Sequence, residues 1–403
     1  MSGLARIEPP MNRELRTALI GMTILALALG IGRFVLTPLL PLMQADHGLS
    51  LIAGGWLAST NMLGYLLGAL LCALRPLPPR LSLRIGAIGV ALATLGMGLT
   101  THLDIWLLWR FAAGVASAAL VVHGIAWSMA RLRAAGRPLF EHVVFSGTGV
   151  GIVSSGLLVA AARPLGASSS ALWITFGIIT VALFAAAWRR LGEDDAIAAA
   201  PSASSGVASP SGPAWALVVT YGLLGFAYTI PAAFLPLIAE QQLHLPALRE
   251  WFWPLFGAAM AVSTLALCWL PARVNNRTVL AACSVCLAGG MLLGVAGHGV
   301  AMMPAVMYTM REARLLALRN PVRLIAALTI TLGIGQAAGP ACAAWLAART
   351  GGFDLPLIAG AAASTAGMIC MLVRRLRRET KSSMDVISSA SGASPSRLCQ
   401  RHS

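Results

Sequence analysis

The chain has 403 residues, of which 58% are hydrophobic and 11% are charged, and its formal net charge is +15. A soluble domain carries about 25% charged residues, so the composition excludes a water-soluble globular protein and predicts an all-α integral membrane protein. The positive charge is almost entirely arginine in short loops between apolar segments. This pattern favours anionic lipid headgroups over nucleic acid as the partner.

Twelve apolar segments follow a polar N-terminal tail (residues 1–16), and a transmembrane helix needs about 20 such residues. We predict spans at 17–42, 52–74, 82–101, 105–130, 142–162, 171–188, 214–239, 251–270, 278–296, 298–310, 324–347 and 355–373. The segment 191–213 is rich in Ser, Ala, Gly and Pro, which is typical of a flexible linker. It divides the chain into two predicted six-helix bundles, at 17–190 and 214–378. The Ser-rich tail at 379–403 is expected to be disordered.

Arginine placement predicts how the chain crosses the membrane. Only Arg163, Arg249 and Arg349 lie in the predicted outer loops, and the inner loops and both termini hold most of the 29 basic residues. The positive-inside rule then places both termini on the cytoplasmic side of the cell inner membrane. The segment 278–310 is shorter than the about 40 residues that two full crossings need, so we expect spans 9 and 10 to be shortened.

The two halves begin with similar phrases. LTPLLPLMQAD occupies Leu36–Asp46, and IPAAFLPLIAE occupies Ile230–Glu240. Aligning them pairs Pro41 with Pro236, at an offset of 195 positions. The repeat predicts that spans 1 and 7 are equivalent helices of two related halves.

Two motifs resemble those of a known transporter group. Residues 30–71, GIGRFVLTPLLPLMQADHGLSLIAGGWLASTNMLGYLLGALL, resemble the start of the YbfB/YjiJ-type subgroup of the major facilitator superfamily. LWRFAAGVASA (Leu108–Ala118) resembles the span-4 motif of that superfamily, an Arg followed by Gly four residues later. The resemblance covers most of 17–378 and implies two six-helix bundles and secondary transport of a small molecule, often as proton-coupled efflux. Cys72 stands where the family has an acid that helps latch the two halves together.

Seven polar side chains within the spans are candidates for lining a central cavity: Arg33, Asn61, Tyr65, Arg110, Tyr221, Tyr228 and Gln336. Arg33 lies deep in span 1, where a cation is costly unless it faces a water-filled cavity or a partner. It would form a site for a substrate carboxylate or a proton-linked site, or serve as a structural arginine held by backbone carbonyls near Pro38 and Pro41. The span-4 motif favours a functional Arg110, whereas its position near the outer boundary would also let it snorkel.

Four residues are candidates for coupling or gating: Asp46, His123, Glu141 and Glu240. Asp46 and Glu240 close spans 1 and 7, where they would form an outer gate or be solvated in a loop. His123 can change charge near neutral pH, although a packed, hydrogen-bonded role is favoured, and Glu141 suits a helix N-terminus. No carboxylate lies near the middle of any predicted span, so the usual proton carrier is absent.

No sequence motif of a hydrolase, metalloprotease or ATPase is present, so we expect no enzymatic activity. Cys283 and Cys286 form a C-x-x-C without a second ligand pair, so we expect helix packing and neither a metal nor another cofactor. Trp251 and Trp253 are expected in an interfacial belt. The sequence therefore predicts a monomeric secondary transporter of a small, anionic or drug-like solute, with alternating access and protons as the coupling ion that the family implies. The alternative is a non-transporting sensor or assembly factor of the same fold.

Overall fold

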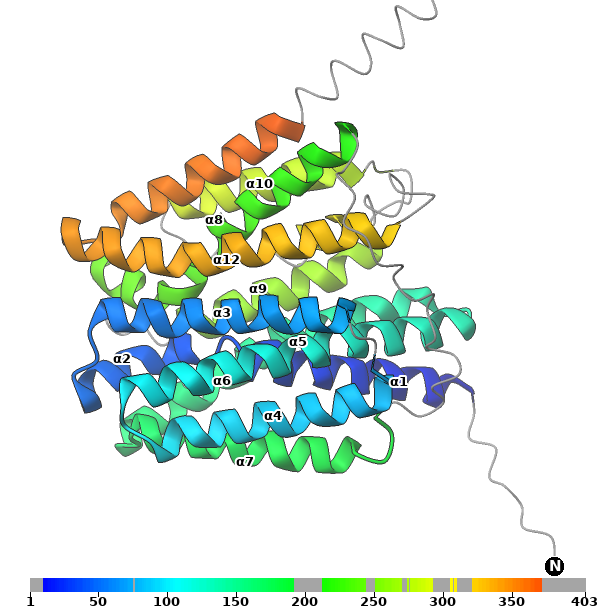
Figure 1. Cartoon of the computed structure of the whole chain (residues 1–403), viewed down its shortest axis with the longest axis horizontal. Coiled ribbons are helices and arrows are strands. Elements are labelled where there is room, and N and C mark those ends of the chain that lie inside the picture. Colours follow the sequence, from blue (N-terminus) through cyan, green and yellow to red (C-terminus); the bar gives the residue numbers. More distant parts are fainter. Residues whose placement is uncertain are drawn as a thin grey trace, which may run out of the picture.

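The computed structural model describes residues 10–74, 77–191, 212–243, 251–269, 276–292 and 321–371, with isolated positions at 274, 305, 306, 308 and 309. All regular elements in these ranges are helices, and nine of the described helices are long and apolar enough to cross a membrane. Figure 1 shows them side by side, with their long axes roughly aligned. The predicted all-α membrane fold is confirmed.

The first span consists of three consecutive segments: α1 (Pro10–Leu25), the π-helical turn η1 (Ala26–Ile31) and α2 (Leu36–His47). The next helices are α3 (Leu51–Leu74), α4 (Pro79–Leu99), α5 (Leu103–Ala134), α6 (Glu141–Ala162) and α7 (Ser169–Ala187). The second set is α8 (Gly212–Leu243), α9 (Phe252–Ala266), α10 (Asn276–Leu292), α12 (Pro321–Thr350) and a last helix, Asp354–Met371.

Eleven of the twelve predicted spans coincide with these helices. The shortened span 9 is α10, with 17 residues, and α9 is shorter still, with 15 residues. The predicted span 10 (298–310) lies mostly outside the described residues, as do most of the linker and both predicted tails.

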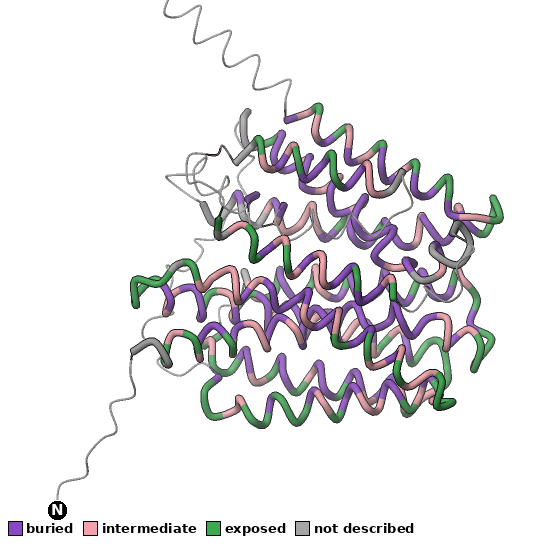
Figure 2. Tube along the Cα trace, turned by 180° about the vertical axis from the view of Figure 1, so that it is seen from behind, coloured by how far each residue is buried: buried purple, intermediate pink, exposed green. Residues whose placement is uncertain are grey.

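Large apolar side chains on the outer helices point away from the interior, as a lipid environment requires. Ile85, Leu92 and Ile178 are each about half exposed or more. Figure 2 shows that buried positions concentrate toward the inside of the helix array and exposed ones along its outer faces. A water-soluble bundle would place polar groups on these outer faces.

The two sets of helices meet along two antiparallel pairs, α3 with α12 and α6 with α9, and Figure 1 shows α3 lying directly beside α12. Small residues permit the close approach. A Cβ added at Gly149 would lie 2.5 Å from the Ala261 backbone nitrogen, and one added at Gly55 would lie 2.5 Å from the Ala344 Cβ. Packing of this kind is typical of helix pairs in membranes.

The repeated prolines explain a contact between the two halves. A proline has no N–H, so Pro41 leaves the Thr37 carbonyl without its helical partner, and Pro236 does the same to Ala232. The Thr37 hydroxyl donates to the Ala232 carbonyl at 2.7 Å. Thr37 and Ala232 are separated by 195 positions, the offset of the repeat itself, so equivalent positions of α2 and α8 touch each other.

The prediction that Trp253 lies in an aromatic belt at the membrane interface is wrong. Its side chain is 1% exposed, whereas Trp251 is 50% exposed. Residues two positions apart on a helix point in different directions, so only one of the pair can face the outside at the start of α9.

Candidate central binding site

The helix of the first span is interrupted between η1 and α2, at Arg33. Pro38 cannot donate to the Phe34 carbonyl, which instead accepts from the Thr37 N–H at 3.1 Å. Upstream, the Gly32 N–H bonds Leu27 and the Phe34 N–H bonds Leu29, five positions back in each case. Such π-bulges are frequent at functional sites because they re-aim a side chain within a helix. Arg33 lies within this break.

Arg110 and Asn61 stabilise the break through its backbone. The Arg110 guanidinium donates from Nη2 to the Arg33 carbonyl at 2.7 Å, from Nη1 to Gly32 at 3.2 Å and from Nε to Leu57 at 3.4 Å. Asn61 donates from Nδ2 to the Gly32 carbonyl at 3.2 Å and to the Arg110 carbonyl at 2.9 Å. Arg110 is 1% exposed, so it does not snorkel.

The Arg33 side chain points toward the second set of helices and is 5% exposed. Its Nη2 donates to the Gln336 side-chain oxygen of α12, and its Nε lies 2.9 Å from the Met62 sulfur. The guanidinium carbon lies 4.6 Å from the Tyr65 ring centroid and 5.2 Å from that of Phe34, within the range of cation–π interactions. These partners are neutral side chains, so the alternative of a guanidinium held by backbone carbonyls does not describe Arg33.

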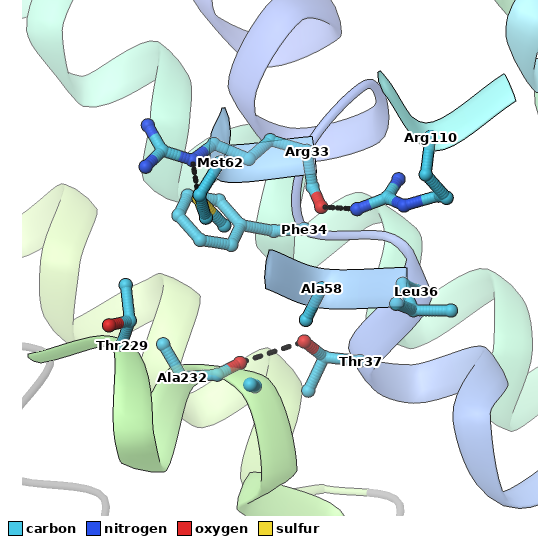
Figure 3. Close-up of a pocket in the computed structure, with 10 residues that line it drawn as sticks. Arg33, Phe34, Leu36, Thr37, Ala58, Met62, Arg110, Thr229 and Ala232 are labelled. Atoms are coloured by element: carbon cyan, nitrogen blue, oxygen red, sulfur yellow. Dashed lines mark hydrogen bonds between the residues drawn. The ribbon is translucent and has the colours of Figure 1, made fainter. Parts of the chain in front are cut away.

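A small cavity lies between the two sets of helices beside Arg33 (Figure 3). Ten residues line it: Arg33, Phe34, Leu36, Thr37, Ala58, Met62, Arg110, Thr229, Ala232 and Ala233. It has room for about one water molecule. In Figure 3 the Phe34 ring lies between Arg33 and the α8 residues Thr229 and Ala232, and Arg110 reaches the Arg33 carbonyl from the other side. The described conformation is therefore closed around the site.

The predicted tyrosines gather around the same cation. Tyr221 and Tyr228 are 1% and 0% exposed, and both lie near Arg33, as Tyr65 does. The Tyr228 ring meets Phe34 edge-on, with centroids 6.2 Å apart. The structure thus brings Arg33, Tyr65, Tyr221, Tyr228 and Gln336 together, while Asn61 and Arg110 bond the backbone beneath them.

The four predicted coupling or gating residues lie in other settings. Asp46 accepts a hydrogen bond from the Ser169 N–H at 2.6 Å, so it caps α7. The His123 ring bonds the Ser82 hydroxyl at 2.9 Å and the Ala119 carbonyl at 3.1 Å. Glu141 pairs with Arg133 at 2.7 Å, and the side chain of Glu240, in α8, lies outside the described set.

Sequence reasoning missed the apolar part of this site. Phe34 and Met62 contact Arg33, and Trp253 and Phe256 stack on each other beside Phe34, with centroids 5.3 Å apart. In sequence these residues look like ordinary core. The one available signal was that Phe34 directly follows the buried arginine.

Comparison with known proteins identifies the family of this chain. A family model described as "Uncharacterised MFS-type transporter YbfB" matches residues 25–374. The "Uncharacterized MFS-type transporter YceJ" of Bacillus subtilis (strain 168) is 35% identical over 94 residues, which are 22% of this chain and 24% of that protein. This match therefore spans about a quarter of that relative's length.

A solved structure has the same fold. The crystal structure of the human organic anion transporter MFSD10 (TETRAN) superposes with a TM-score of 0.62 and 16% sequence identity, covering 90% of this chain and all of that one. At this identity the likeness concerns the fold alone. Because the family model covers most of the sequence, the chain belongs to the major facilitator superfamily, in the family of the MFS-type transporter YbfB, and is a multi-pass membrane protein.

Proposed function

We propose that the chain transports a small organic anion by alternating access and that Arg33 binds the anion. The observation that carries the proposal is a buried guanidinium between the two sets of helices whose described side-chain partners are all neutral. A buried charge without a counterion is costly, and an anionic solute would supply that counterion. The structural relative MFSD10 is described as an organic anion transporter, which is the same substrate class.

Alternating access has a physical basis in how the two sets of helices touch. The hydrogen bond from Arg33 to Gln336 joins α12 to the broken first span, and Thr37 joins α2 to α8. Rotation that opens a path to one side would break some of these contacts and admit a solute to Arg33. A carboxylate that takes the place of the Gln336 oxygen would keep the cation paired during this movement.

For coupling, we propose efflux driven by a proton gradient, as the family resemblance implies. The chain has 14 acidic residues, and none lies near the middle of a span. A proton would therefore travel with the substrate carboxylate or through His123. Uptake into vesicles that carry either a pH gradient or a membrane potential alone would decide whether protons take part.

For topology, we propose an inner-membrane protein with both termini in the cytoplasm, because only three of its 29 basic residues lie in predicted outer loops. Figure 1 agrees that α1 begins and the last helix ends toward the same end of the helix array. Labelling of single cysteines introduced at either terminus, from each side of the membrane, checks this placement.

The transport test uses proteoliposomes and a panel of labelled aliphatic and aromatic monocarboxylates. We expect saturable uptake of at least one anion, and at least a tenfold loss of that uptake in Arg33→Gln. The matched control is Arg349→Gln, which removes an exposed arginine that stacks on Trp345. Unchanged uptake in Arg33→Gln would remove the basis of the proposal and favour a different site.

A further inference from the structure

We infer that the central site is selective for aromatic monocarboxylates, with Tyr228 and Trp253 as specificity-determining residues. This inference rests on the proposed function, Arg33-dependent anion transport, and adds the chemistry of the substrate's body. It comes from three features of the described residues: a cluster of four rings, two buried donors on those rings that have no partner, and one cation that is free to exchange its partners.

The first feature is a cluster of Phe34, Tyr228, Trp253 and Phe256, which we call the aromatic cluster. Phe34 lies 6.2 Å from Tyr228 and 6.5 Å from Trp253, both edge-on, and Phe256 stacks against Trp253 at 5.3 Å and Tyr228 at 6.3 Å. These are the centroid separations at which aromatic pairs attract each other. Each ring thus contacts two others, and Phe34 also lies beside the guanidinium.

The cluster is divided between the two sets of helices. Phe34 belongs to the broken first span, whereas the other three rings come from α8 and α9. When the two sets move apart, Phe34 separates from Tyr228 and Trp253, and ring surfaces open directly beside Arg33. A planar aromatic solute would restore the lost ring contacts on both sides, which a puckered aliphatic body of the same size would do less well.

The second feature is a pair of unused hydrogen-bond donors. The Tyr228 hydroxyl and the Trp253 indole nitrogen are fully buried and have no partner among the described residues. Buried donors are normally paired, and an orphaned one in a native structure calls for an explanation. A carboxylate or another oxygen on the substrate would accept from these donors, and both rings contact Phe34, which lies beside the Arg33 guanidinium.

The third feature limits the charge of the substrate. Each of the three nitrogens of Arg110 donates to a backbone carbonyl, so pairing Arg110 with a ligand would disturb the hydrogen bonds that hold the break in the first span. Arg33 bonds only neutral side chains, and a carboxylate is a stronger partner for a guanidinium than the Gln336 amide oxygen. One exchangeable guanidinium matches one carboxylate, and the second charge of a dianion would have to draw Arg110 away from those carbonyls.

The test measures equilibrium binding to the purified full chain in lipid nanodiscs. The probes are benzoate, cyclohexanecarboxylate of the same charge and similar size, and the dianion phthalate. Two stacking faces together predict that benzoate binds about tenfold tighter than cyclohexanecarboxylate. Phthalate is expected to bind at least tenfold more weakly than benzoate.

Two variants assign this selectivity to residues. Tyr228→Phe keeps the ring and removes the donor, so benzoate affinity should fall about tenfold. Trp253→Leu removes a ring and should bring benzoate and cyclohexanecarboxylate to similar affinities. The control Trp345→Leu removes an exposed tryptophan of α12 and should leave the ratio unchanged. If Trp253→Leu does not fold, the wild-type ratio and Tyr228→Phe decide the question.

The outcomes separate the inference from the proposed function. Equal affinity for benzoate and cyclohexanecarboxylate, with both lost in Arg33→Gln, would overturn aromatic selectivity and leave Arg33-dependent anion transport standing. Phthalate that binds as tightly as benzoate would overturn the single-charge argument. Absence of any Arg33-dependent anion binding would overturn both.

Discussion

Two buried arginines of this protein have opposite hydrogen-bond environments. Arg110 donates from Nη1 and Nη2 to the Gly32 and Arg33 carbonyls in the break of the first span, and from Nε to the Leu57 carbonyl of α3. Arg33 contacts an amide oxygen, a thioether and two rings, each of which is a weaker partner than a carboxylate. Arg110 is therefore a positioning residue for the break, and Arg33 is the residue free to exchange its partners.

Replacing Arg110 should reduce stability more than replacing Arg33. In Arg110→Met the carbonyls of Gly32 and Arg33 lose donors, which should cost about 3 kcal/mol. Arg110→Lys keeps the charge but cannot reach all three carbonyls, so its loss should be intermediate. Thermal unfolding in detergent measures both, and an Arg110→Met variant as stable as Arg33→Gln would contradict the assigned role.

The hydrogen bond from Thr37 to Ala232 should depend on Pro236. Thr37→Val removes only the hydroxyl, leaves the Ala232 carbonyl unpaired and should cost about 1 kcal/mol. In Pro236→Ala the new N–H can bond that carbonyl within α8, so the same Thr37→Val change should then cost little. A double-mutant cycle measures the difference. Additive effects would show that the freed carbonyl is not what Thr37 stabilises.

Sequence reasoning proposed the polar side chains around Arg33 but not the contacts that they make with it. Arg33 was recognisable because ionisable groups inside a span are rare. Gln336 was named with it as a cavity residue, yet neither local sequence encodes the direct hydrogen bond between them across 303 positions. Phe34 and Trp253 were missed because the local sequence around an apolar residue in a span is the same whether its side chain contacts lipid, a neighbouring helix or a binding site.

At the level of helices, the positions of the helices were predictable from the sequence, whereas the break within the first span was not. Hydropathy located eleven of the described helices, nine of them long enough to span, because a bilayer requires continuous apolar runs. Pro38 and Pro41 predicted a kink in the first span. The π-helical turn upstream was not predictable, because the Gly32 carbonyl that follows it accepts from Asn61 of α3 and Arg110 of α5. Such a break arises from tertiary contacts rather than from propensity.

The close approach of α6 and α9 gives an element-level prediction. A Cβ at Gly257 would lie 2.6 Å from the Ile152 side chain and 2.7 Å from the Val153 nitrogen, so Gly257→Ala should force the helices apart and cost about 1–3 kcal/mol. At Gly289 of α10, no atom of the described residues lies within 4 Å of the corresponding position, so Gly289→Ala should be neutral or stabilising by up to about 1 kcal/mol.

Thermal unfolding of the two alanine variants under identical conditions checks the comparison. Equal stabilities would mean that α6 and α9 can shift at no cost, and the packing argument for that pair of helices would fail.

At the scale of the whole molecule, the repeated phrases are explained by the contact between Thr37 and Ala232. Equivalent positions of α2 and α8 meet where each proline frees a carbonyl, and the broken first span places Arg33 beside that junction. Under the proposed alternating access, a fixed cation at the meeting point of the two sets of helices would face each side of the membrane in turn. Transport and anion binding would then depend on the same side chain.

Solute counterflow tests this central claim most directly, because it requires the loaded site to face both sides of the membrane in turn. Proteoliposomes preloaded with an unlabelled monocarboxylate should accumulate the labelled form transiently, with no pH gradient or membrane potential applied. The account predicts an overshoot for the wild type and for Arg349→Gln and none for Arg33→Gln. An equal overshoot in Arg33→Gln would contradict it.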